Sequence, residues 1–85
     1  RYSEAETLLQ EALAMRKQLL GNTHPDVGRC LDNLAMLYSA QGNPEEANPL
    51  CIKALAILEH SLRADHPWTV RCRENLEALR NEQGG

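Results

Sequence analysis

The sequence predicts an all-α protein built from antiparallel helical hairpins, in a single domain over residues 1–85. Residues that favour strands are scarce, because the chain has 14 Leu and 10 Ala but two Val, two Ile, three Thr and no Phe. A shift of 42 residues superposes the two halves with 16 identities in 43 pairs, against about three or four expected by chance. Two His-Pro pairs and other boundary residues divide each repeat into two helices.

The first predicted helix covers residues 3–20. Its apolar residues lie at helical spacing on one face, and the same pattern returns 42 residues later. These residues are Ala5, Leu8, Leu9, Ala12, Leu13, Leu19 and Leu20. Because this is the pattern of the second helix of a repeat, we expect the chain to begin in mid-repeat. The open flank of this helix is then expected to be covered by further sequence or by another molecule.

The second predicted helix covers residues 25–41. Pro25 suits the first helical position, where no amide hydrogen bond is needed, and it forces His24 into the extended backbone of an N-cap. Gly42 suits the left-handed cap that ends a helix. The predicted apolar face consists of Val27, Cys30, Leu31, Leu34, Leu37 and Tyr38.

The third predicted helix covers residues 44–62. The segment Asn43-Pro44-Glu45-Glu46 predicts a capping box, in which Asn43 is the cap and Glu46 follows three residues later. Pro49 removes one amide donor in the first two turns, which predicts a bend without a break. The apolar face consists of Ala47, Leu50, Cys51, Ala54, Leu55, Leu58 and Leu62.

The fourth predicted helix covers residues 67–83 and follows the second His-Pro pair. It keeps an apolar stripe toward the preceding helix, made of Cys72, Leu76 and Leu79. The opposite side, which would meet a following helix, is polar. There Arg73, Glu77 and Arg80 stand in place of Leu31, Ala35 and Tyr38 of the preceding copy. A helix that is apolar on one side only is typical of the end of a repeat array, so we expect a C-terminal capping helix.

Charge and composition exclude several classes of partner. Nine basic and 12 acidic residues give a formal net charge of -3 without a basic block, so we expect no nucleic acid and no membrane as partner. No apolar run approaches the roughly 18 residues of a membrane helix, and the first residues lack the layout of a signal peptide. Three widely spaced cysteines do not form a disulfide framework. We therefore expect a soluble, cytoplasmic protein.

The motifs resemble the tetratricopeptide repeat family, in the 42-residue form of kinesin light chains, over nearly the whole chain. The residues that carry the resemblance are Leu31, Leu34, Ala35, Tyr38, Gly42, Ala47 and Ala54. The chain departs from the family pattern where Leu31 replaces a frequent Trp, and where Pro44 and Cys51 replace aromatic residues. The resemblance implies a right-handed superhelix whose concave groove, lined by the first helix of each repeat, binds a peptide segment or protein surface.

A polar stripe at helical spacing predicts the groove residues. Its two copies are Arg29, Asp32, Asn33 and Met36, and Arg71, Glu74, Asn75 and Ala78. The Asn amides offer donors and an acceptor to an extended peptide backbone, and the resemblance implies that Asn33 and Asn75 hold peptide main chain. The alternative is a solvated face on which Arg29 pairs with Asp32 and Arg71 pairs with Glu74.

Other constellations point to weaker hypotheses. His24 with Cys30 and His66 with Cys72 offer nitrogen and sulfur to zinc, but the pairs lie at separate helix starts, so we expect no metal and no cofactor. No nucleophile shares a face with a His and no phosphate loop occurs, so we expect no enzyme. Trp68 is expected to pack over the end of helix 44–62 or to anchor a ligand. The alternative functions are a homodimer through the helix 3–20 and a module of a larger enzyme or signalling protein.

Overall fold

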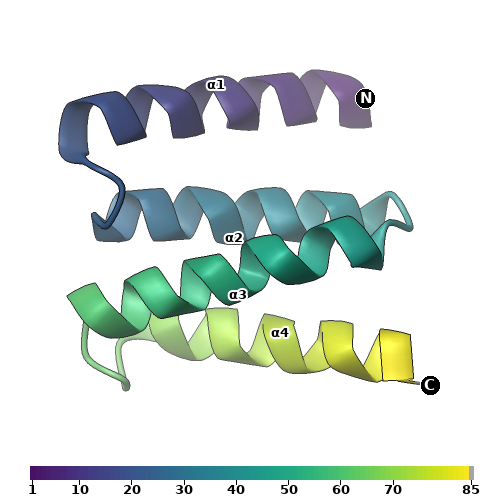
Figure 1. Cartoon of the computed structure of the whole chain (residues 1–85). Coiled ribbons are helices and arrows are strands. Elements are labelled where there is room, and N and C mark those ends of the chain that lie inside the picture. Colours follow the sequence, from purple (N-terminus) through teal and green to yellow (C-terminus); the bar gives the residue numbers. More distant parts are fainter. Residues whose placement is uncertain (85) are drawn as a thin grey trace.

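The computed structural model describes residues 1–84 and consists of four antiparallel α-helices (Figure 1). Their bounds are α1 Tyr2–Leu20, α2 Pro25–Ala40, α3 Pro44–Ser61 and α4 Pro67–Gly84. Each boundary lies within one residue of its predicted position, and residues 1–84 contain no strand. The predicted all-α fold is therefore confirmed. The last residue of the predicted domain, residue 85, lies outside the described residues.

The helices follow one another in a stack, so that each packs against its neighbours in the sequence (Figure 1). The core lies where α2, α3 and α4 meet, since α2 also contacts α4. Its buried side chains are Val27, Leu31, Ala35, Ala47, Cys51, Ala54, Leu58, Cys72, Leu76 and Leu79. Among the described residues, α1 contacts α2 alone and has no buried residue. The first helix is thus the least covered part of the stack.

Both His-Pro pairs begin a helix as predicted. The Nδ1 atom of His24 accepts a hydrogen bond from the backbone N–H of Asp26 at 3.1 Å, which caps α2. At the start of α4, Nδ1 of His66 accepts from the backbone N–H of Trp68 at the same distance. Each His therefore satisfies one of the amide groups that the first turn of a helix leaves without a partner.

The link between α2 and α3 differs from the prediction. Gly42 has a φ of +83°, as its role as a left-handed cap requires, and its N–H and that of Asn43 return to the carbonyls of Ser39 and Tyr38. The predicted capping box is wrong, because the Asn43 side chain makes no capping hydrogen bond. Asn43 closes the end of α2 with its backbone, and its φ of -117° and ψ of 65° are not those of an extended N-cap. The helix α3 continues past Pro49.

The two sides of α4 differ in the way that the sequence predicts. Cys72, Leu76 and Leu79 are buried, whereas Glu77 and Arg80 are exposed. Arg73 is half-buried and donates to Oε2 of Glu59 at 3.4 Å and to the carbonyl of Ala64 at 3.5 Å. Within residues 1–84 no helix is both long enough and apolar enough to cross a membrane.

The polar side of α4 makes its capping role testable. Replacing Arg73 by Leu, Glu77 by Ala and Arg80 by Tyr together would recreate the face of an internal repeat and expose an apolar strip. We expect the triple variant to associate or to aggregate, because nothing in residues 1–84 covers that strip. Light scattering measures the association of the triple variant, with the unchanged chain as the reference. Unaltered solubility and mass would contradict the capping role.

Candidate functional site

The structure brings the two predicted polar stripes together on the side where α2 meets α4. The Nη2 atom of Arg71 on α4 donates to Oδ1 of Asn33 on α2 at 3.4 Å. The amide of Asn75 donates from Nδ2 to both oxygens of Asp32, at 3.2 and 3.3 Å. Two helices that are separated by α3 in the sequence therefore present one joint surface.

Seven of the eight predicted groove residues are accessible on this surface. Arg29, Arg71, Glu74 and Ala78 are exposed, and Asn33, Met36 and Asn75 are half-buried. We call these seven residues, together with Trp68, the α2–α4 surface.

Asp32 is placed differently from the prediction. Its side chain does not line an open groove, because the residue is only 4% exposed. Its carboxylate is held by the Asn75 amide, lies 4.0 Å from Nε of Arg71 and accepts from Sγ of Cys51 at 3.8 Å. A carboxylate that is shielded from water needs hydrogen-bond donors from the protein. For Asp32, α4 supplies most of these donors. Asp32 is therefore a buried link among α2, α3 and α4.

The predicted salt bridges of a merely solvated face do not form among the described residues. Arg71 approaches Asp32 and not Glu74. Arg29 does not pair with Asp32, and its guanidinium instead lies over the Trp68 ring, 4.7 Å from the ring centroid. Trp68 also meets His66 edge to face, with ring centroids 5.3 Å apart, and packs against the core. The first turn of α4 thereby adds the half-buried ring of Trp68 to the α2–α4 surface, and the Arg29 cation of α2 lies over this ring.

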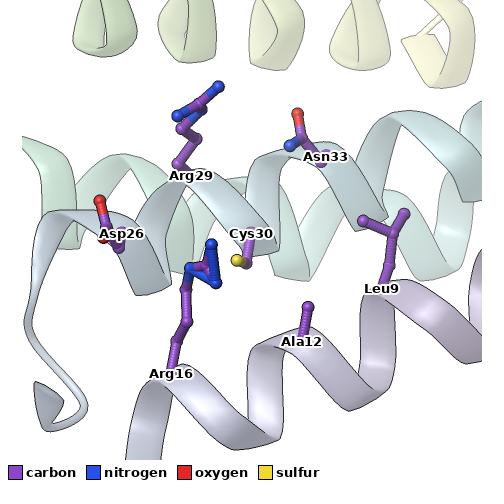
Figure 2. A pocket seen from close by; sticks show the side chains of 7 residues that line it. All are labelled: Leu9, Ala12, Arg16, Asp26, Arg29, Cys30 and Asn33. Carbon is purple, nitrogen blue, oxygen red and sulfur yellow. The ribbon is translucent and has the colours of Figure 1, made fainter. Parts of the chain in front are cut away.

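A hollow of about 240 Å³ lies between α2 and α1 (Figure 2) and borders the α2–α4 surface, with which it shares Arg29 and Asn33. Its lining residues are Leu9, Ala12 and Arg16 from α1 and Asp26, Arg29, Cys30 and Asn33 from α2. In Figure 2 the Arg16 side chain rises from α1 toward Cys30. Sequence reasoning missed this hollow, although the repeat places Leu9 and Ala12 at the positions of the core residues Cys51 and Ala54.

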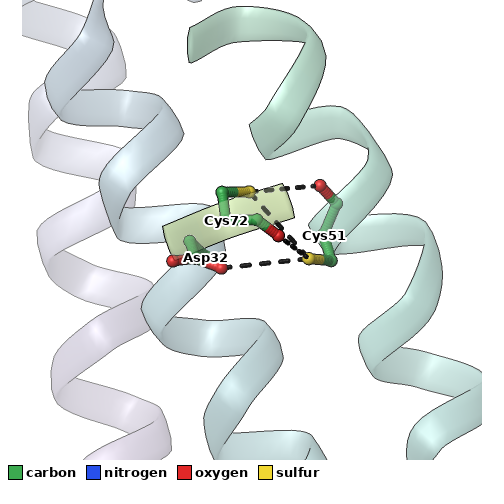
Figure 3. A group of neighbouring side chains, drawn as sticks. All are labelled: Asp32, Cys51 and Cys72. Atoms are coloured by element: carbon green, nitrogen blue, oxygen red, sulfur yellow. Dashed lines mark hydrogen bonds between the residues drawn. The ribbon is translucent and has the colours of Figure 1, made fainter. Parts of the chain in front are cut away.

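Asp32, Cys51 and Cys72 form a buried polar cluster inside the core (Figure 3). The Sγ atoms of Cys51 and Cys72 lie 3.9 Å apart, and each thiol also reaches the backbone carbonyl of the other residue. These three side chains could offer three ligand atoms to a metal ion. The carboxylate is already bound by Asn75 and faced by the Arg71 cation, and thiols that donate to carbonyls are protonated. The chemistry of these three side chains thus favours a hydrogen-bonded core cluster over a metal site.

The state of the cysteines gives a prediction. The hydrogen bond with Cys51 and then burial raise the pKa of the Cys72 thiol well above its usual range, and burial raises the pKa of Cys30. Cys51 is fully buried. Because the thiolate is the reactive form, we expect all three to react slowly with a thiol reagent in the folded chain and at full speed in denaturant. Rapid labelling of all three, or zinc that is retained through chelation, would contradict this.

A family model described as Tetratricopeptide repeat matches residues 1–50 and again residues 32–85, so the two matches together cover the whole chain. No curated protein matches the chain.

Proposed function

The chain belongs to the tetratricopeptide repeat family, and from that premise we propose that it holds a peptide segment or a protein surface against the α2–α4 surface. Family membership indicates a protein–protein interaction scaffold in general terms, and the family is in general not enzymatic. The proposal adds the place of binding and the kind of ligand. The 42-residue kinesin-light-chain form of the repeat stays a prediction from the sequence.

The observation that carries the proposal is the hydrogen bond from Arg71 to Asn33, since it makes α2 and α4 one continuous accessible surface. Within residues 1–84 the Nδ2 group of Asn33 has no hydrogen-bond partner, so it is free to donate to a peptide carbonyl. The amide nitrogen of Asn75 is engaged by Asp32. Asn33 is therefore the better candidate for holding main chain, whereas the sequence offered both residues equally.

The cations and the ring on the same surface support a preference among ligands. Arg29 and Arg71 are exposed, and Arg29 lies over the half-buried Trp68. A ligand with acidic side chains would meet both guanidinium groups, and an apolar side chain could contact the ring. The formal net charge of -3 supports the proposal that neither nucleic acid nor a membrane is the partner. Three free, buried cysteines support the proposal of a reducing, cytoplasmic compartment.

A library of short displayed peptides tests the proposal. Selected peptides should bind the Asn33→Ala variant roughly 5- to 150-fold more weakly, which corresponds to about 1–3 kcal/mol for a lost hydrogen bond. Arg29→Gln and Arg71→Gln should weaken acidic peptides most, and this effect should fade as salt is added. Lys53→Gln on α3 is the control and should bind normally. Peptides whose binding none of these variants changes would contradict the proposal.

A second function rests on the exposed side chains of α1. Leu8 is 67% exposed, Met15 58% and Leu19 75%, which is unusual for large apolar residues on one helix. Two copies of the chain could cover these residues by joining their first helices in a homodimer.

A further inference from the structure

Cys51 on α3 and Cys72 on α4 form a buried pair of thiols that the function proposed above does not use. Their Sγ atoms lie 3.9 Å apart, and both residues are fully buried. Sγ of Cys51 also lies 3.6 Å from the carbonyl oxygen of Cys72, and Sγ of Cys72 lies 3.7 Å from the carbonyl oxygen of Cys51. Figure 3 shows the two side chains reaching toward each other from the two helices. Each sulfur is therefore close both to the other sulfur and to the backbone that carries it.

This placement suits a disulfide bond. The sulfurs of a disulfide are about 2 Å apart, so the two thiols have to approach each other by about 2 Å. Rotation about the Cα–Cβ bonds supplies a movement of this size, since each sulfur is one bond beyond Cβ. The two helices then need little displacement. The bond would join α3 to α4 and close a loop of about 20 residues.

Cys30 is placed differently from the pair. It lines the hollow between α1 and α2. In residues 1–84, the contacts of the thiols join Cys51 and Cys72 to each other and to Asp32, and none of these contacts involves Cys30. The folded chain therefore favours one of the three possible pairings of its cysteines.

Burial decides which oxidant suits this pair. A bulky reagent reaches the two thiols only when the helices separate, because neither residue has exposed area. The hydrogen bond with Cys51, and then burial, raise the pKa of the Cys72 thiol, which keeps the reactive thiolate scarce. Hydrogen peroxide is uncharged and little larger than water, so a small opening admits it. We expect a slow reaction whose product depends on which thiols are neighbours.

We propose that Cys51 and Cys72 are a modification site for hydrogen peroxide, which converts them to a disulfide that fastens α4 to α3. One thiol sulfur attacks a peroxide oxygen, the O–O bond breaks, and the thiol proton leaves with the released oxygen as water, so that a sulfenic acid remains. The second thiol sulfur attacks the first sulfur, the S–O bond breaks, and the hydroxyl takes the second thiol proton and leaves as water.

The two steps balance and use no other reagent. Two thiols and one hydrogen peroxide give one disulfide and two waters, and each sulfur loses one electron to the peroxide oxygens. Because the second thiol is already in contact with the first, disulfide formation should outrun further oxidation of the sulfenic acid to a sulfinic acid. This site goes beyond the function proposed above and does not depend on it.

Treatment of the whole folded chain with hydrogen peroxide tests the proposal. After the reaction, free thiols are alkylated in denaturant, and mass spectrometry of the peptides identifies the linked cysteines. The spacing from Cys30 to Cys51 equals that from Cys51 to Cys72, so these two pairings close loops of the same length. In denaturant we expect comparable amounts of both disulfides, because loop closure then costs the same. In the folded chain we expect Cys51–Cys72 to exceed Cys30–Cys51 by about tenfold or more.

The melting temperature measures whether the bond fastens α4. The linked chain should melt roughly 10 °C higher than the reduced chain, because the cross-link restricts the unfolded chain, and dithiothreitol should reverse the rise. Cys30→Ser should keep both the disulfide and the rise. Cys51→Ser and Cys72→Ser should each lose both, with circular dichroism to confirm that the variants are folded.

Four results would overturn the proposal. They are comparable amounts of Cys51–Cys72 and Cys30–Cys51 in the folded chain, sulfinic acid as the main product at Cys51 or Cys72, thiols that stay reduced until the chain unfolds, and a linked chain that melts no higher than the reduced one. The comparison of the folded and the denatured chain needs no variant, so it decides even where a serine variant does not fold.

Discussion

Replacing Asn75 by alanine should lower the free energy of unfolding by about 1–3 kcal/mol, the cost of leaving a buried group short of a hydrogen-bond partner. Asp32 is 4% exposed, and both of its carboxylate oxygens accept from Nδ2 of Asn75. The remaining neighbours, Nε of Arg71 at 4.0 Å and Sγ of Cys51 at 3.8 Å, are too distant or too weak to replace the amide. The variant therefore retains a buried carboxylate without its main donor.

Thermal unfolding of matched variants measures this effect. For a domain of this size each kcal/mol lowers the melting temperature by roughly 4–8 °C. The control is Asn33→Ala, the same substitution one repeat earlier, which removes only an exposed acceptor for Arg71 and should cost a few tenths of a kcal/mol. In an Asp32→Ala background, Asn75→Ala should lose most of its effect. Equal losses for Asn33→Ala and Asn75→Ala would show that the Asp32 contact contributes little.

The contrast between Asn33 and Asn75 marks the limit of prediction from sequence. The repeat makes the two residues equivalent, and periodicity put both on one polar stripe. Their surroundings differ because α2 lies beside Asn75, whereas no described helix takes that place beside Asn33. Spacing predicts the face on which a residue lies, but its partner depends on which helices are stacked next to it. The burial of Asp32 could not be predicted for the same reason.

At Gly28, the packing of α2 against α3 limits the size of the side chain. Its counterpart in the repeat is Val70, so the sequence alone does not indicate a need for glycine. In the structure, a Cβ at position 28 would lie within about 3 Å of Leu58 and Ile57 on α3. Val70 lies on α4, which no described helix follows, and it remains half-buried. By contrast, the helix boundaries depend on local residues such as His24, Pro25 and Gly42, and these were predicted to within one residue.

The 85-residue chain should associate with itself as its concentration rises, because α1 leaves large apolar side chains in water. Leu8, Met15 and Leu19 lie on one helix and are each more than half exposed. Burial of apolar surface contributes about 25 cal/mol for each Å², and a small domain has little stability to spare. A two-fold dimer in which the first helices meet is the simplest closed arrangement, since the same patch then covers itself.

Sedimentation velocity over a wide concentration range measures the association. The double variant Leu8→Glu with Leu19→Glu should stay monomeric, because charges in the contact would have to be desolvated. The control is Ile52→Glu, which changes a side chain of similar exposure on α3, 50%, and should associate like the unchanged chain. If α1 instead frays in a monomer, its amides should exchange quickly with solvent. A strictly monomeric chain whose amides in residues 5–19 are well protected would contradict both outcomes, since it would mean that α1 is stable with its apolar side chains in water.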